Sequence, residues 1–135
     1  MDEFTAAARS LADAETVVAM TGAGMSTETG IPDFRGEGGL WKRYEPRDFH
    51  IDSFARDPAA FWEQWIELHD AAFDGGDVAP NPGHEAFATL ETAGLLDAVV
   101  TQNVDGLHQA AGTETVIELH GTHDRVICRG CGRRR

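Results

Sequence analysis

The sequence predicts an α/β fold built on a parallel sheet, and three observations support this class. Short apolar runs at 16–20, 97–101 and 115–119 are rich in β-branched residues, as buried parallel strands are. Segments with helically spaced apolar residues separate these runs. Candidate functional residues follow the ends of all three runs, where parallel sheets bind their ligands. The order of the elements therefore predicts βαβ connectivity.

The first 73 residues predict one strand, one long loop and three helices. Residues 4–14 form an amphipathic pattern with Phe4, Ala7, Ala8 and Leu11 on one face, and they lead into a buried strand at 16–20. Residues 22–41 are rich in Gly, Ser and Thr and predict an ordered loop with short helical turns. A loop of this length is uncommon unless it carries function. Residues 54–73 predict a short helix and then a longer one that begins near Pro58.

The remaining residues predict a linker followed by alternating helices and strands. Residues 75–83 contain the glycines and prolines of a linker. The next helix, at 84–92, is expected to face inward with Phe87 and Leu90 and to end at Gly94. The last elements are a buried strand at 97–101, a short helix at 105–111 closed by Gly112, and a strand at 115–119 that ends at His120.

The charge of the chain is strongly acidic, with 11 basic and 23 acidic residues and a formal net charge of −12. We therefore expect no direct binding to nucleic acid over most of the surface. Lys42 is the only lysine, and this bias together with the acidic composition fits a salt-adapted or GC-rich source. A dispersed acidic surface of this kind more often serves solubility than docking of a basic partner.

Targeting signals are not evident in the sequence. No apolar run approaches the about 20 residues that a membrane span requires, so we expect no membrane association. The acidic N-terminus lacks the basic and then apolar layout of a secretion signal, which predicts a cytoplasmic protein. Both cysteines, Cys128 and Cys131, lie in one Cys-x-x-Cys motif, which in a reducing compartment indicates metal or redox use.

A glycine-rich turn, Gly22-Ala23-Gly24-Met25-Ser26, follows the first predicted strand. Glycines there let the backbone approach a pyrophosphate, and the following helical turn offers N–H groups to its oxygens. Thr27 stands where the usual dinucleotide fingerprint has its third glycine. A tight turn without a ligand is the alternative interpretation.

Two further polar segments follow the second and third strands. Gln102, Asn103 and Asp105 place amides and a carboxylate where they can bind sugar hydroxyls, a carboxamide or a water, although an Asn/Asp turn that caps the next helix has the same pattern. His120 is well placed as a general base, with a hydrogen-bonded structural histidine as the alternative. A metal site that pairs His120 with His123 does not match the spacing of a Cys/His finger.

Taken together and in this order, these motifs resemble the sirtuin family. The motifs are the glycine turn at 22–26, Gly-Ile-Pro-Asp-Phe-Arg-Gly at 30–36, Thr-Gln-Asn-Val-Asp-Gly-Leu-His at 101–108, His-Gly at 120–121 and Cys-x-x-Cys at 128–131. The resemblance covers nearly the whole chain. It implies a Rossmann-like domain with a small helical and zinc-ribbon module, which binds NAD and acyl-lysine in the cleft between the two.

The resemblance also implies a role for each matching residue. The NAD phosphates would bind at Gly22, Ala23, Gly24 and Ser26, and the mobile loop over the nicotinamide ribose would include Ile31, Asp33, Phe34 and Arg35, with Trp41 also in the cofactor site. Phe34 would shield the reactive sugar carbon from water. Gln102 and Asn103 would hold the ribose and a water, while Val104 and Asp105 would line the nicotinamide pocket.

The implied reaction is NAD-dependent deacylation of lysine side chains. His120 matches the family's general base, which deprotonates a ribose hydroxyl, and Asn103 would assist catalysis. The products would be free lysine, nicotinamide and acylated ADP-ribose. Sirtuins that prefer acidic acyl groups carry a Tyr and an Arg three residues apart, and the matching positions here are Trp65 and Leu68. A succinyl carboxylate would have no cation there, so we predict deacetylation over desuccinylation.

The resemblance divides the chain into three parts: a Rossmann-like part with the NAD loop at 1–53 and 84–121, a helical module and linker at 54–83, and the start of a zinc module at 122–135. Cys128 and Cys131 would supply half of a four-cysteine zinc site. In sirtuins the second cysteine pair and later strands follow the position of Arg135, so we expect an incomplete enzyme. The alternatives are an inactive fragment or partner-binding module, and an ADP-ribosyl transferase on the same scaffold.

Overall fold

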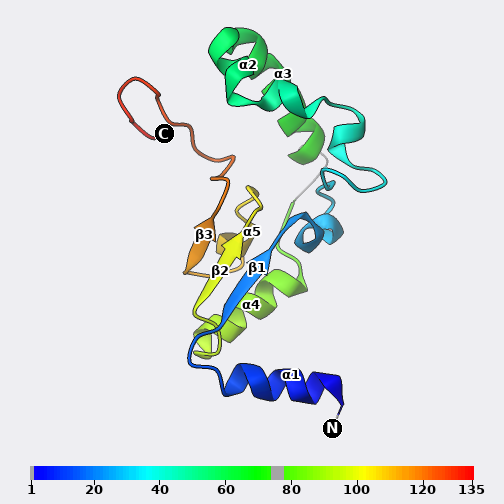
Figure 1. The fold of residues 1–135 in the computed structure, drawn as a ribbon, viewed down its shortest axis with the longest axis vertical. Helices are drawn as coiled ribbons and strands as arrows, with labels where there is room; N and C mark the ends of the chain where they lie inside the picture. Colours follow the sequence, from blue (N-terminus) through cyan, green and yellow to red (C-terminus); the bar gives the residue numbers. More distant parts are fainter. Residues whose placement is uncertain (1, 74–77) are drawn as a thin grey trace. The chain divides into compact units, whose positions relative to one another are not determined.

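The computed structural model describes residues 2–73 and 78–135, which form two compact units (Figure 1). Unit 1 comprises Met1–Met25 and Pro80–Arg135, and unit 2 comprises Ser26–Ala79. Residues 75–77 of the predicted linker lie outside the described residues.

Unit 1 is built on a three-stranded parallel sheet. Strands β1 (Val18–Thr21), β2 (Ala98–Thr101) and β3 (Val116–Glu118) lie in the order β1-β2-β3, and both neighbouring pairs are parallel. The central strand β2 is buried, as predicted. The α/β class and the parallel sheet expected from the sequence are therefore confirmed, with strand boundaries within two residues of the predicted runs.

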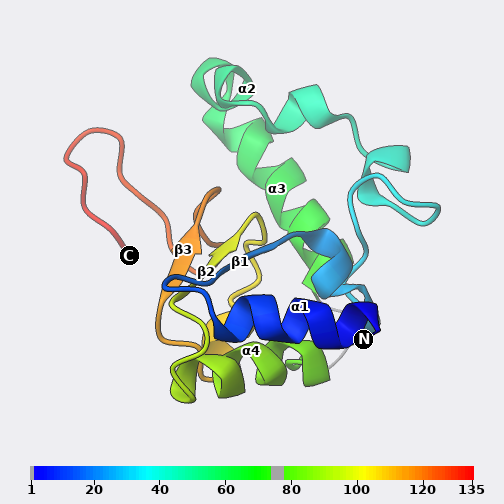
Figure 2. The same ribbon diagram turned by 60° about the horizontal axis from the view of Figure 1, so that its bottom comes forward.

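The two faces of this sheet differ in their covering. Thr21 and Thr101 are register partners and so share one face, together with Val99 two residues earlier on β2. The His108 imidazole of α5 (Leu107–Ala110) reaches Thr21 on this face, and α5 contacts α4 (Pro82–Thr92). Figure 2 shows α4 alongside the three strands. The core of unit 1 lies here, because Val99, Ala88 and Leu107 are all buried.

The opposite face carries exposed apolar residues, and this corrects the prediction that the first strand is buried. Val18 and Met20 are 53% and 67% exposed, and Ile117 on the same face of β3 is also exposed. The apolar run at 16–20 lacks polar alternation, so the sequence predicted burial on both faces. β1 is an edge strand, and among the described residues of its own unit only the α4 and α5 side is packed.

The helices of unit 1 begin and end at capping residues. Helix α1 (Glu3–Ala12) starts at Asp2, whose carboxylate accepts a hydrogen bond from Thr5 N–H at 2.8 Å, and none of its residues is buried. Helix α4 starts at Asn81, whose side chain accepts from Gly83 and His84 N–H groups. Gly94, with φ +71°, follows its C-cap, as predicted for this position.

The inward face of α4 differs from the prediction. His84 and Ala88 are buried and Phe87 is half-buried, whereas Leu90 is 38% exposed. His84 and Ala88 lie four residues apart and so share one helix face, to which Leu90 does not belong. The apolar character of Leu90 misled the prediction, because a histidine takes the inward place.

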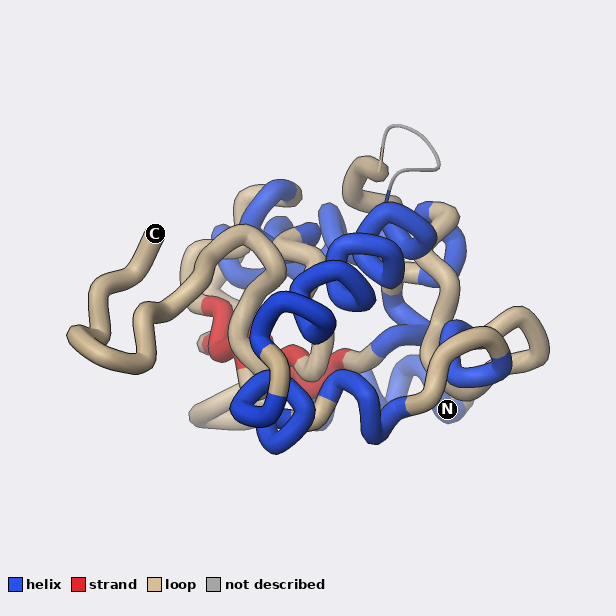
Figure 3. The backbone as a smooth tube through the Cα atoms, turned by 90° about the horizontal axis from the view of Figure 1, so that it is seen from above, coloured by secondary structure: helices blue, strands red, loops and turns tan. Residues whose placement is uncertain are grey.

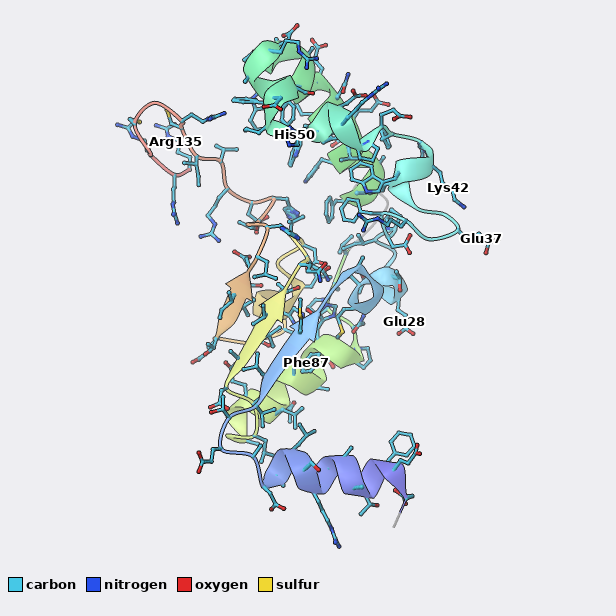
Figure 4. The ribbon with its side chains drawn as sticks, in the orientation of Figure 1. Glu28, Glu37, Lys42, His50, Phe87 and Arg135 are labelled. Carbon is cyan, nitrogen blue, oxygen red and sulfur yellow. The ribbon has the colours of Figure 1, made fainter. Side chains whose placement is uncertain are left out.

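Unit 2 combines an ordered loop with two helices. The loop contains short 3₁₀ turns at Thr27–Thr29 and Leu40–Lys42, as predicted for residues 22–41. A further 3₁₀ turn at Pro46–Phe49 lies beyond the predicted segment. Helix α2 (Ile51–Arg56) is followed by α3 (Pro58–Phe73), which begins at Pro58 as expected. In the loop, the Lys42 ammonium donates to the Glu37 carbonyl at 2.6 Å, and Figure 4 labels both residues.

The C-terminal segment of unit 1 forms a small hairpin beyond β3, drawn as loop in Figure 3. Val126 and Arg135 exchange two backbone hydrogen bonds, and Ile127 pairs with Arg134 in an antiparallel bridge. The turn of this hairpin contains Cys128 and Cys131. Across the described residues, no helix has the length and apolarity that crossing a membrane requires.

Candidate functional site

The glycine turn directly follows β1 in unit 1. Residues Ala23–Met25 form a 3₁₀ turn, and Met25 N–H donates to the Gly22 carbonyl at 2.9 Å. A Cβ atom added at Gly22 or at Gly24 would meet no heavy atom within 4 Å. The turn therefore faces open space on the side where side chains would otherwise project, and a ligand could approach the backbone there.

Asn103 joins this turn to the segment that follows β2. Its side-chain amide donates to the Gly22 carbonyl at 3.0 Å, and its backbone N–H donates to Thr101 Oγ1 at 3.0 Å. Gln102 N–H extends the sheet by donating to the Thr21 carbonyl at 3.0 Å. Asn103 is buried, whereas the Gln102 side chain is exposed. Two segments about 80 residues apart thus meet at the carboxyl ends of β1 and β2.

Val104 and Asp105 continue this segment toward α5. Asp105 Oδ1 accepts a hydrogen bond from Leu107 N–H at 3.0 Å, while Gly106 between them has φ +69°. The helix-capping turn that the sequence offered as an alternative is therefore present. Capping occupies one carboxylate oxygen of Asp105, and both Val104 and Asp105 are half-buried.

His120 lies next to the Asn103 segment, after the end of β3. Leu119 N–H donates to the Thr101 carbonyl at 2.9 Å, and His123 N–H donates to the Val104 carbonyl at 3.0 Å. The two bonds lie on either side of His120 in one segment, and on either side of Gln102 and Asn103 in the other. His120 is exposed. The structure thus places the glycine turn, the amide segment and the backbone of His120 at the carboxyl ends of three neighbouring strands.

Two buried histidines lie close to these strand ends, and the sequence gave no functional role to either of them. His84 and His108 are 0% and 1% exposed, and their rings meet edge to face with centroids 4.9 Å apart. Burial lowers the pKa of both imidazoles below the ordinary 6.5, and for His108 the neighbouring His84 adds to this, while the charge of Asp105 opposes it. Both imidazoles are therefore neutral at neutral pH.

A hydroxyl pair connects His108 to Asn103. His108 Nε2 lies 2.9 Å from Thr21 Oγ1, and Thr21 Oγ1 donates to Thr101 Oγ1 at 2.9 Å. Both threonines are buried. Each of them ends an apolar strand, and this shared position was the signal in the sequence that could have identified the pair.

Six of the predicted cofactor residues belong to unit 2 and are placed within that unit. The loop that holds them is closed by backbone bonds from Leu40 N–H to the Asp33 carbonyl and from Trp41 N–H to the Phe34 carbonyl, both at 2.9 Å. The Phe34 and Trp41 rings contact each other with centroids 5.1 Å apart. The Asp33 carboxylate accepts from Gly36 N–H, so it stabilises a turn. The other three residues are Ser26, which precedes the 3₁₀ turn at Thr27–Thr29, half-buried Ile31 and exposed Arg35.

The two predicted substrate residues, Trp65 and Leu68, lie on α3 and are half-buried. The Trp65 ring stacks on the His69 imidazole with centroids 5.2 Å apart and contacts Trp62 at 5.7 Å. His69 lies 3.5 Å from the Asp70 carboxylate. The surroundings of Trp65 within unit 2 are therefore mainly aromatic.

Cys128 and Cys131 are free and exposed in the hairpin turn. Gly132 N–H donates to the Cys128 carbonyl at 2.8 Å, and Gly132 has φ +71°. Hydrogen bonds from the backbone of Cys131 and Gly130 lower the pKa of the Cys128 thiol. Within the ranges 2–73 and 78–135, no three His, Cys, Asp or Glu side chains are grouped so that they could hold a metal ion.

Comparison with protein families matches residues 22–135 to the Sir2 family. The chain is 56% identical to an NAD-dependent protein deacetylase of Haloarcula marismortui over 99% of its length, and 49% identical to NAD-dependent protein deacylase 2 of Archaeoglobus fulgidus over 96%. These alignments cover 52% and 50% of the two relatives. The chain thus spans about half the length of the curated relatives it matches.

Solved structures of Sir2 proteins also match this chain over about half of their own length. A mutant Sir2 homologue in complex with ADP-ribose matches all of this chain with a TM-score of 0.86 and 41% identity, over 53% of its own length. A complex of Sir2 with a p53 peptide and NAD⁺ matches 99% of the chain with a TM-score of 0.80 and 38% identity, over 52% of its own length.

Proposed function

The chain belongs to the Sir2 family, and from this premise we propose that the protein is an NAD-dependent protein-lysine deacetylase. It would transfer the acyl group from a modified lysine to ADP-ribose and release nicotinamide. The observation that carries the proposal is the hydrogen bond between Asn103 and the Gly22 carbonyl, beside which His120 is held. The chain spans about half the length of its relatives, and product analysis tests whether it turns over by itself.

The residues of unit 1 fit a dinucleotide. The open space at Gly22 and Gly24 can admit phosphate oxygens next to backbone N–H groups, and Ala23 lies between them. Ser26, at the start of unit 2, would donate its hydroxyl to the same phosphates. When bound, NAD supplies a ribose carbon whose nicotinamide group can leave. The remaining chemistry consists of binding, orientation and proton transfer by side chains of the protein.

His120 would act as the general base that takes a proton from a ribose hydroxyl. Its exposure at the end of β3 leaves the imidazole accessible to a ligand. Gln102 and Asn103 would hold the ribose and a water. Val104 and Asp105 would line the nicotinamide pocket, where the Asp105 carboxylate accepts from the carboxamide while it also caps α5.

The loop residues of unit 2 would close over the ribose. Ile31, Asp33, Phe34, Arg35 and Trp41 belong to one loop held by backbone bonds and by the Phe34–Trp41 ring contact. In this role Phe34, which is partly exposed, would shield the reactive sugar carbon from water.

The preferred acyl group would be acetyl. Trp65 and Leu68 occupy the positions at which sirtuins specific for acidic acyl groups carry a Tyr and an Arg, and the aromatic surroundings of Trp65 support an apolar contact. A buried succinyl carboxylate without a cation would cost several kcal/mol, on the order of the penalty for an unpaired buried charge.

Cys128 and Cys131 would supply two of the four ligands of a structural zinc site. Both thiols are exposed in a tight turn, and this geometry suits one half of a zinc ribbon. Because the pair supplies two ligands, four-coordinate zinc would need two more. The described residues contain no third acidic, histidine or cysteine ligand near the pair.

The cellular setting is also part of the proposal. A cytoplasmic location is proposed because a Cys-x-x-Cys motif without a disulfide framework suits a reducing compartment. The charge of −12 supports a salt-adapted, acidic proteome without direct nucleic-acid binding. The protein substrate would carry an acyl-lysine.

Product analysis by mass spectrometry tests the proposed reaction. The protein is incubated with NAD and an acetyl-lysine peptide, and the expected products are free lysine peptide, nicotinamide and acetyl-ADP-ribose in equal amounts. Transfer of ADP-ribose onto the peptide, with the acetyl group retained, would instead identify an ADP-ribosyl transferase. Absence of both products, with a cooperative melt, would identify an inactive or partner-binding chain.

A further inference from the structure

A chain of hydrogen bonds runs under the proposed ribose site, from α5 through both strand ends to Asn103. His108 Nε2, Thr21 Oγ1, Thr101 Oγ1 and the Asn103 backbone N–H are linked by contacts of 2.9, 2.9 and 3.0 Å. All four residues are buried, and His108 is the deepest, at 1% exposed. A buried polar chain of this kind restricts its members to a single arrangement when every donor has an acceptor.

The bond between the two threonine hydroxyls assigns the direction of this chain. The Thr21 hydroxyl donates to Thr101, so Thr21 Oγ1 accepts a proton from His108 Nε2. His108 Nδ1 has no hydrogen-bond partner among the described residues, so it is the bare acceptor of the neutral ring in this arrangement.

The packing around His108 favours the same tautomer. Phe87 and His84 contact its ring, with centroids 5.8 and 4.9 Å away. A positively charged imidazole would place a second N–H in this apolar surrounding. The titratable groups near the ring are His84 on α4 and Asp105 before α5.

We propose that His108 and Thr21 are positioning residues: neutral His108, protonated on Nε2, orients the two threonine hydroxyls so that they fix the Asn103 backbone. The Asn103 side chain is then directed to the Gly22 carbonyl and the space beside the glycine turn. The effect of this arrangement on ligand binding rests on the proposed function, because Asn103 is the residue proposed to hold the ribose and a water. The hydrogen-bonded arrangement itself requires no ligand.

The first test is the tautomer in the unmodified protein. Nitrogen-15 NMR of the histidine rings reports which ring nitrogen carries the proton. We expect Nε2 of His108 to be protonated and Nδ1 to be bare at neutral pH. Protonation on Nδ1 would overturn the proposal, and this measurement does not depend on any variant being folded.

The second test compares three variants by hydrogen exchange of the Asn103 amide. Thr21→Val removes the hydroxyl, and we expect Asn103 exchange to rise about fivefold relative to that of Val99, the effect of losing one hydrogen bond. Thr21→Ser keeps the hydroxyl and should restore the ratio. Thr113→Val is the matched control, because Thr113 is also buried and no described residue pairs with its hydroxyl.

The outcomes separate this inference from the proposed function. An unchanged ratio in Thr21→Val, or an equal rise in Thr113→Val, would overturn the positioning role. Titration with ADP-ribose then tests its consequence: affinity should fall several-fold in Thr21→Val and stay unchanged in Thr113→Val. If the unmodified protein binds no ADP-ribose, the proposed function fails, while the tautomer and the exchange ratio still decide the positioning of Asn103.

Discussion

The side-chain amide of Asn103 donates to the backbone carbonyl of Gly22 across 3.0 Å, although 81 residues separate them along the chain. The bond joins the segments that follow the carboxyl ends of β1 and β2. The turn after β3 holds His120 beside them. Parallel sheets place their ligands at this edge.

Replacement of His120 by Ala should remove general-base catalysis. We expect kcat/KM for the acetyl-lysine peptide to fall by about 10² to 10⁴, because proton transfer by a positioned base contributes that much. NAD binding should remain measurable by calorimetry, since the backbone bonds that flank His120 are retained. The matched control is His50→Ala in unit 2, an exposed histidine outside the proposed site. Substantial deacylation by His120→Ala would refute the role of the imidazole.

Replacement of Gly24 by Ala should weaken nucleotide binding without a loss of stability. Gly24 does not have a positive φ, and an added Cβ meets no atom, so the melting temperature should stay unchanged. The methyl group would occupy the space that the proposal gives to phosphate, and ADP-ribose affinity should fall at least tenfold, roughly the 1.4 kcal/mol of one such contact. Gly94→Ala is the opposite control: Gly94 has φ +71°, so Ala there should cost about 1 kcal/mol of stability and leave affinity unchanged. Unaltered affinity in Gly24→Ala would contradict the assignment.

The stability of the protein should decrease as the pH falls below about 6.5, the ordinary value for histidine. Burial lowers the folded-state pKa of His84 and His108, so the unfolded chain binds protons first. Their neutral-state contribution is fully present above 6.5 and is lost between 6.5 and the lower folded pKa. Urea unfolding at a series of pH values measures this, and His108→Gln should reduce the slope. A His108 pKa at or above 6.5, determined by NMR titration, would show that the ring is not buried as described.

Deacetylation should exceed desuccinylation when matched peptides are compared. Leu68→Arg should raise the relative rate of desuccinylation, because a cation would become available to the succinyl carboxylate. Glu67→Arg, at the exposed neighbouring position, controls for added charge. Faster desuccinylation than deacetylation by the unmodified protein would overturn the substrate assignment.

The sequence predicted the architecture of unit 1 because its signals are local. Apolar runs and the glycine after α4 each act within a few residues, and the strands and helices lie where these signals placed them. The proline at the start of α3 is a signal of the same kind in unit 2. The order of these elements along the chain then predicted a parallel sheet. Exposure of β1 could not be predicted in this way, because it depends on which segments pack against each face.

The candidate site was only partly accessible to sequence reasoning. The glycine turn, Asn103 and His120 were identified from residue types at strand ends, and their proximity was an inference from sheet topology. The link through Thr21, Thr101 and His108 depends on side chains that meet across 80 or more residues. The position of each threonine at the end of an apolar strand was the one local signal, and nothing local marks His108 as their partner. Similarly, the inward place of His84 on α4 follows from packing against His108.

The most direct test of the central claim is an NMR titration of the protein with ADP-ribose. If the glycine turn, the amide segment and the imidazole surround one nucleotide ribose, the amide signals of Gly22, Gly24 and Asn103 and the ring signals of His120 should shift together, with one dissociation constant. Signals of α1, at the other end of the sheet, should stay constant. Saturating ADP-ribose that leaves these four residues unchanged, or that shifts His120 with a separate constant, would contradict the account.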